Sequence, residues 1–126
     1  MEEIKYIPGD LVKFKDKVQA ITNIDRQTSY RIEISMENGI CVCKPEDIET
    51  HISPIPISPE ILKKNGWNEV GLNVFEHPNN SLIEVHLYTV QSSEVYYENE
   101  LLLEFDYVHQ LQHLLFGLGL DSNLKV

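Results

Sequence analysis

The chain has 126 residues, of which 42% are hydrophobic and 24% charged, and its formal net charge is −10 at pH 7. This length and composition fit one compact globular domain or two small ones. The residues before Ile57 include 7 basic and 10 acidic side chains, and the remainder include 3 and 10. Because sequence-independent nucleic-acid binding relies on clustered Lys and Arg, this charge argues against a general nucleic-acid-binding role.

The sequence predicts a cytoplasmic protein with no membrane segment. No apolar run approaches the length of a membrane-spanning helix, and the first residues lack the basic and apolar regions of a signal peptide. Cys41 and Cys43 lie in one predicted strand, and we expect them on its opposite faces. In that arrangement they are small buried hydrophobes that neither form a disulfide nor share a metal.

The first half of the chain is rich in short β-forming runs. These runs lie at residues 10–17, 18–24, 30–35 and 40–44. The stretches 25–29 and 37–39 separate them, and the second is a strong tight-turn signal. A single helical turn at 44–49 and a final strand complete an order similar to SH3-like barrels. We therefore predict a small SH3-like β-barrel over residues 1–53.

The first predicted strand carries three lysines, and its inner face carries Val12 and Phe14. Lys13, Lys15 and Lys17 are expected on or near its outer face. Such a row can contact phosphate, which makes it the candidate nucleic-acid site. A charged edge strand also prevents edge-to-edge aggregation, and we favour this structural interpretation.

Residues 54–67 join the two halves through a short helix with clear start and stop signals. Ser58 suits the N-cap, and Pro59 suits the first helical position because its missing N–H would be unpaired there. Gly66 is placed to take the left-handed conformation that ends the helix. A helix this short is stable only when docked, so we predict Trp67 in the core rather than as a ligand platform. The stiff, proline-containing joint predicts two packed subdomains with little hinge freedom.

Residues 54–126 predict a second, α+β subdomain. Antiparallel strands are expected at 72–76, 82–88, 95–97 and 101–105. A helix over 107–118, capped by Asp106 and ended by Gly119, presents a broad apolar arc that covers this sheet. The predicted fold class is therefore α+β: a small SH3-like β-barrel followed by an antiparallel sheet covered by one C-terminal helix.

The other side of this helix is the candidate partner-binding surface. It carries His109, Gln112, His113 and Phe116 in place of the usual Lys and Glu. We predict that this face is covered and that Phe116 is mostly buried. The cover is either the first half of the chain, which is slightly favoured, or the same helix of a second subunit.

His109 and His113 are spaced so that both imidazoles can share a zinc ion. The residues between them lack the glutamate of the metalloprotease pattern, and no third ligand is evident nearby. A metal or small-ligand site here is a minor alternative, and no cofactor is predicted. We find no nucleophile elbow, glycine-rich phosphate loop or dinucleotide-binding motif, and so we predict a protein that is not an enzyme.

Two stretches, PIPISPEILKKNGW at residues 54–67 and YVHQLQHL at 107–114, carry a family resemblance. The chain resembles a family of small uncharacterised proteins of Bacteroides and relatives, often in phage-like or mobile-element surroundings. The resemblance covers residues 47–126, and the first half matches more loosely. It implies a source but no activity, cofactor or catalytic residue.

We predict a non-enzymatic cytoplasmic protein-interaction module that binds an unidentified protein partner or itself. The alternatives are a nucleic-acid contact through the three lysines and a metal or small-ligand site at the His109/His113 pair. The sequence alone favours the first of these three hypotheses because it contains no catalytic constellation.

Overall fold

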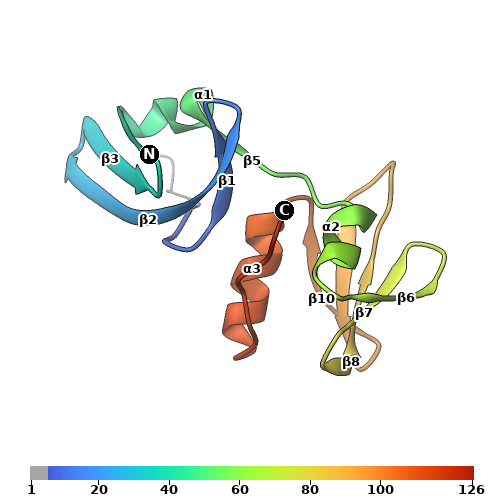
Figure 1. The fold of residues 1–126 in the computed structure, drawn as a ribbon. Helices are drawn as coiled ribbons and strands as arrows, with labels where there is room; N and C mark the ends of the chain where they lie inside the picture. Colours follow the sequence, from blue (N-terminus) through green and yellow to red (C-terminus); the bar gives the residue numbers. More distant parts are fainter. Residues whose placement is uncertain (1–5) are drawn as a thin grey trace. The chain divides into compact units, whose positions relative to one another are not determined.

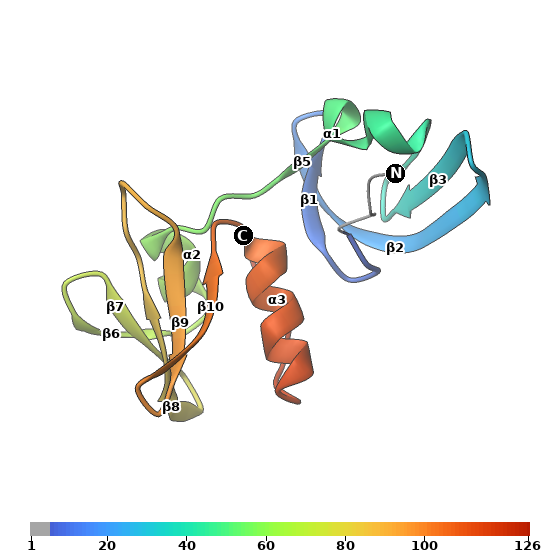
Figure 2. The same cartoon turned by 180° about the vertical axis from the view of Figure 1, so that it is seen from behind.

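The computed structural model describes residues 6–126, and the chain divides into two compact units, Met1–Ile55 and Pro56–Val126. The fold is α+β and consists mostly of strands (Figure 1). Each unit holds one five-stranded antiparallel sheet, and the second unit also carries the C-terminal helix α3, as Figure 2 shows from behind. Across residues 6–126, no helix is long and apolar enough to cross a membrane.

The first unit is a row of five antiparallel strands with two short helices before the last. Its elements are β1 (Leu11–Phe14), β2 (Lys17–Thr28), β3 (Arg31–Met36), β4 (Gly39–Cys43), the 3₁₀ helix η1 (Pro45–Asp47), α1 (Ile48–His51) and β5 (Ile52–Pro54). The strand order is β4-β3-β2-β1-β5. The long β2 pairs with β1 near its start and with β3 farther along. In the described residues, the edge strands β4 and β5 do not pair, so the sheet is not closed and the SH3-like barrel stays a prediction.

Two of the predicted strand limits in this unit are wrong. The first strand ends at Phe14, because Lys15 and Asp16 take positive φ angles of 52° and 64° and form a two-residue turn. Positive φ at both central residues is what a hairpin with right-handed strand twist requires. The strand β2 continues through the expected break at 25–29 and reaches Thr28, which pairs with Arg31.

The cysteines lie on the same face of β4, and the expectation that they face opposite sides is wrong. Positions two apart on a strand share a face, and the Sγ atoms of Cys41 and Cys43 are 4.0 Å apart. Both are free thiols, Cys41 buried in the core of the first unit and Cys43 packed against it. Burial raises the pKa of both thiols, and the neighbouring Cys41 contributes to a pKa of about 11 for Cys43.

The second unit is a five-stranded meander with two helices. Its elements are α2 (Pro59–Lys64), β6 (Asn68–Gly71), β7 (Val74–His77), β8 (Asn80–His86), β9 (Ser93–Tyr97), β10 (Glu100–Phe105) and α3 (Val108–Gly117). Leu62 of α2 and Leu111 of α3 join inward side chains such as Phe75 and Val85 in one buried cluster. Both helices therefore pack on the same face of the sheet. The sequence did not predict β6, whose four residues are all exposed and carry no alternation.

The joint helix has the predicted start and end. The Ser58 hydroxyl accepts a hydrogen bond from the Ile61 N–H at 3.3 Å. Gly66 adopts a φ of 83°, and the N–H of Trp67 donates to the Leu62 carbonyl at 3.0 Å. Trp67 is 4% exposed, which confirms that it belongs to the core.

The start of α3 differs from the prediction, whereas its end is confirmed. Tyr107, not Asp106, is the N-cap residue. The Gln110 side chain accepts hydrogen bonds from the backbone N–H groups of both residues, at 2.8 Å from Asp106 and 3.0 Å from Tyr107. Gly119 has a φ of 73°, and the following N–H, of Leu120, closes the helix end on a carbonyl of α3.

After α3, the last residues of the chain form a segment that contacts the end of α2 and joins no sheet. The Asn65 amide holds the backbone of Lys125 from both sides. Its oxygen accepts from the Lys125 N–H at 2.8 Å, and its nitrogen donates to the Lys125 carbonyl at 2.8 Å. The Lys64 ammonium also donates to the Val126 carbonyl at 3.0 Å. The C-terminal segment is therefore fixed to the second unit by polar contacts.

Candidate functional site

The four residues predicted to form a partner-binding face do not share one exposed surface. His109 and Gln112 are buried, whereas Phe116 is 72% exposed. Phe116 is thus not buried within the second unit, and its cover by a second subunit stays a prediction. Gln112 donates to the Ser122 carbonyl at 3.1 Å. Phe116 lies on the same side of the helix as His109 but in the last turn, and the burial of that side ends before it reaches Phe116.

The His109/His113 pair packs as aromatic rings. The two ring centroids are 5.6 Å apart at an interplanar angle of 71°, and His109 also stacks on Tyr107 at 6.0 Å. In the part of the chain that the structure describes, no group of three or more His, Cys, Asp or Glu is placed to hold a metal ion. These ring-to-ring contacts are typical of aromatic side-chain packing.

The three lysines of the candidate nucleic-acid site do not form a row. Lys13 lies on β1, Lys15 in the turn and Lys17 at the start of β2. Lys13 and Lys15 line a hollow of about 380 Å³ together with His51, while the Lys15 ammonium lies 5.2 Å from the centroid of the Phe14 ring. Because the turn separates them, the lysines present no continuous basic strand.

A different group of polar side chains gathers on the second sheet, on the face opposite the core. Along β8, Ile83 and Val85 are fully buried, which directs the alternate residues Glu84 and His86 away from the core. The neighbouring β9 repeats this pattern, with Val95 inside and Glu94 and Tyr96 outside. In the strand register, Glu84 lies opposite Tyr96 and His86 lies opposite Glu94.

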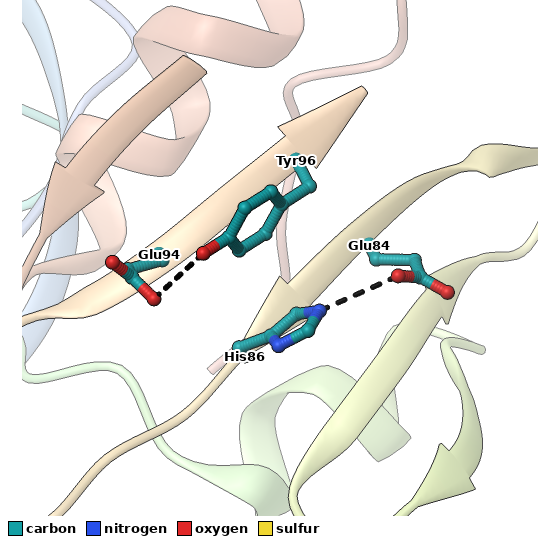
Figure 3. Close-up of polar contacts among 4 residues, drawn as sticks. All are labelled: Glu84, His86, Glu94 and Tyr96. Carbon is teal, nitrogen blue, oxygen red and sulfur yellow. Dashed lines mark hydrogen bonds and ion pairs between the residues drawn. The ribbon is translucent and has the colours of Figure 1, made fainter. Parts of the chain in front are cut away.

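Figure 3 shows the contacts that these four side chains make. The Tyr96 hydroxyl donates to the Glu94 carboxylate at 3.0 Å, and the His86 Nε2 lies 3.3 Å from a carboxylate oxygen of Glu84. The His86 and Tyr96 rings are 4.6 Å apart between centroids, at an angle of 50°. Each carboxylate is thus held beside an aromatic ring, and all four side chains are only half-buried.

The Glu94 carboxylate also raises the pKa of two nearby tyrosine phenols. Its hydrogen bond with Tyr96 is the largest cause of a raised pKa for that phenol, and a hydrogen bond to Glu94 raises the pKa of Tyr88 in the same way. Both phenols therefore remain protonated at neutral pH and act as donors to Glu94. The carboxylate is oriented by neutral groups, which leave its negative charge in place.

Two further glutamates extend this group across four strands and create like-charge pairs. Glu76 on β7 lies directly opposite Glu84, and Glu104 on β10 lies directly opposite Glu94. We call the six residues Glu76, Glu84, His86, Glu94, Tyr96 and Glu104 the acidic face. No Lys or Arg occurs between Lys64 and Lys125, so no Lys or Arg of these strands balances it. Like charges directly opposite each other destabilise a sheet.

The acidic face was not predicted from the sequence. The available signal was a glutamate at an outward position of each of four strands, together with the excess of acid in the second half of the chain. The spacing of these glutamates along the chain does not reveal their proximity, because turns of different length separate the strands. The pairing register of the strands is what sets these glutamates opposite one another.

The acidic face has the composition of a surface that binds cations. Carboxylates form strong charge-assisted hydrogen bonds with Lys and Arg, and aromatic rings attract the same groups through their faces. Comparisons of the chain with protein-family models, with curated proteins and with solved structures find no match, and the family resemblance described above stays an expectation.

Proposed function

We propose that the protein is a non-enzymatic interaction module whose acidic face binds a positively charged segment of a protein partner. The observation that supports this proposal is the strand register, which pairs Glu76 with Glu84 and Glu94 with Glu104. Each pair sets two glutamates opposite each other on strands that carry no Lys or Arg. A fold gains nothing from such pairs, whereas a cationic partner relieves their repulsion on binding.

The chemistry of the acidic face favours Lys and Arg side chains over a metal ion. The carboxylates are spread over four strands and are not gathered around one point. The rings of His86 and Tyr96 offer apolar surface between Glu84 and Glu94, which suits the long aliphatic stems of Lys and Arg. A partner segment with several basic residues can then pair with several carboxylates at once.

We further propose that the first unit is an SH3-like barrel and that the protein acts in the cytoplasm. Three features support the barrel: the strand order β4-β3-β2-β1-β5, the 3₁₀ helix that leads into the last strand, and the long β2 shared between two neighbours. In this proposal the first unit is a module separate from the one that carries the acidic face.

The experiment is a calorimetric titration of the whole protein with a short Arg- and Lys-rich peptide at low salt. An acidic peptide of equal length is the control ligand. The double variant Glu84→Gln/Glu94→Gln should bind the basic peptide roughly 2- to 30-fold more weakly, since each exposed ion pair contributes about 0.2–1 kcal/mol. Raising the salt concentration should weaken binding to the wild-type protein.

A charge-matched variant separates this face from the general negative charge of the protein. Glu98→Gln/Glu100→Gln also removes two negative charges, but at the turn between β9 and β10 and at the first residue of β10. This variant should bind nearly as tightly as the wild type. Equal weakening in both double variants, or no binding of the basic peptide at low salt, would contradict the proposal.

A further inference from the structure

A hollow in the second unit lies on the core side of the sheet, away from the acidic face. Its volume is about 260 Å³, and its walls come from the end of α2, the turn between β7 and β8, the end of α3 and the C-terminal segment. A volume of this size suits a small molecule of a few heavy atoms rather than a peptide. The hollow is therefore a separate candidate site.

The C-terminal segment forms one wall of this hollow and is held in place at several points. Asn65 clamps the Lys125 backbone with two hydrogen bonds of 2.8 Å. Gln112 of α3 donates to the Ser122 carbonyl at 3.1 Å, and the partly buried Leu120 and Leu124 pack on the core. The wall is thus part of the folded unit.

The base of the hollow is aromatic and uncharged. The rings of Trp67 and His77, both nearly buried, meet edge to face at 5.1 Å. The Nδ1 atom of His77 accepts a hydrogen bond from the Asn79 N–H at 3.1 Å, and burial lowers the pKa of the imidazole. The ring is therefore neutral at pH 7 and carries its proton on Nε2.

Asp121 supplies the charge. Among the described residues that line the hollow, it is the one carboxylate, and no Lys or Arg is present. Its Oδ1 accepts from the Asn123 N–H at 2.9 Å, which orients the group. The lining also includes Leu115, Leu120 and Leu124. A small space with apolar walls and a single carboxylate is complementary to a small organic cation, because the walls accept its alkyl part and the carboxylate pairs with its charge.

We propose that this hollow binds a small organic cation, an alkylammonium ion, with its charge at Asp121 and its apolar part against Trp67. This site is independent of the acidic face. A metal ion fits less well, since one carboxylate and one imidazole do not complete a coordination shell.

Trp67 is the only tryptophan of the chain, so its fluorescence reports on this site directly. The whole protein is titrated with butylammonium chloride, with sodium chloride and 1-butanol as controls for ionic strength and for apolar binding. Butylammonium should give a saturable change that neither control gives. Asp121 is exposed, so Asp121→Asn should weaken binding by roughly 1.4- to 5-fold, as expected for loss of an exposed ion pair, while Asp106→Asn should not.

Chemical-shift mapping on the wild-type protein provides a test that depends on no variant. Butylammonium should shift the backbone amides of Asn79 and Asn123, whose N–H groups bond to His77 and Asp121. A fluorescence change that does not saturate, an equal response to 1-butanol, or an Asp121→Asn variant that binds as tightly as the wild type would overturn the proposal.

Discussion

Removing two glutamates from the acidic face should make the second unit more stable. The variant is Glu76→Gln/Glu104→Gln, which abolishes both like-charge pairs and keeps the Tyr96–Glu94 and His86–Glu84 contacts intact. Most substitutions destabilise a protein, so an increase in stability is an unusual expectation. It follows only if the carboxylates face each other across the strands.

The magnitude follows from the register. Like charges directly opposite on neighbouring strands cost about 0.2–1 kcal/mol per pair, so the two substitutions together should stabilise the unit by roughly 0.4–2 kcal/mol. In a unit of this size, each kcal/mol raises the melting temperature by about 4–8 °C. The gain should shrink as salt is added, because the screening length falls from about 10 Å at 0.1 M to about 3 Å at 1 M.

The assay is thermal unfolding followed by circular dichroism at low and high salt. Glu98→Gln/Glu100→Gln is the control, since it removes the same number of negative charges but leaves the cross-strand pairs in place. The control should gain less stability at low salt. A Glu76→Gln/Glu104→Gln protein that is no more stable than the control would show that the two carboxylate pairs do not repel each other as the register implies.

Three other predictions concern single contacts. Glu94→Gln should lower the pKa of the Tyr96 phenol toward its ordinary value, measured by tyrosinate absorbance during an alkaline titration, and an unchanged titration would contradict the hydrogen bond. Asn65→Ala should speed hydrogen exchange at the Lys125 amide by releasing the C-terminal segment, whereas equal exchange in both proteins would mean that the clamp does not hold it. Cys43, with a pKa of about 11, should react with iodoacetamide at pH 7 far more slowly than a free thiol, and a rate typical of exposed cysteine would show that burial does not protect it.

The sequence predicted the joint helix well because its signals are local. Ser58, Gly66 and Trp67 each act within a few residues of their partners, and each has the expected contact or backbone angle. The α+β class and most strands followed from alternation for the same reason. The strand β6 was not predicted because all four of its residues are exposed, so its sequence shows no alternation of buried and exposed positions.

The acidic face could not be predicted in the same way because it depends on pairing between strands. The register that sets Glu76 opposite Glu84 follows from turn geometry and from an irregularity near His77, neither of which the residue pattern specifies. Phe116 illustrates a related limit. Helical periodicity placed it on the side of His109, but periodicity does not tell how far along the helix the burial of that side extends.

The most direct test of the central claim is chemical-shift mapping of the whole protein with the Arg- and Lys-rich peptide. The account predicts that the largest shifts occur at Glu84 and His86 on β8 and at Glu94 and Tyr96 on β9. In Glu84→Gln/Glu94→Gln, shifts at these strands should require a correspondingly higher peptide concentration. Shifts centred on Phe116, or no shifts at low salt, would contradict the assignment of the acidic face as the binding surface.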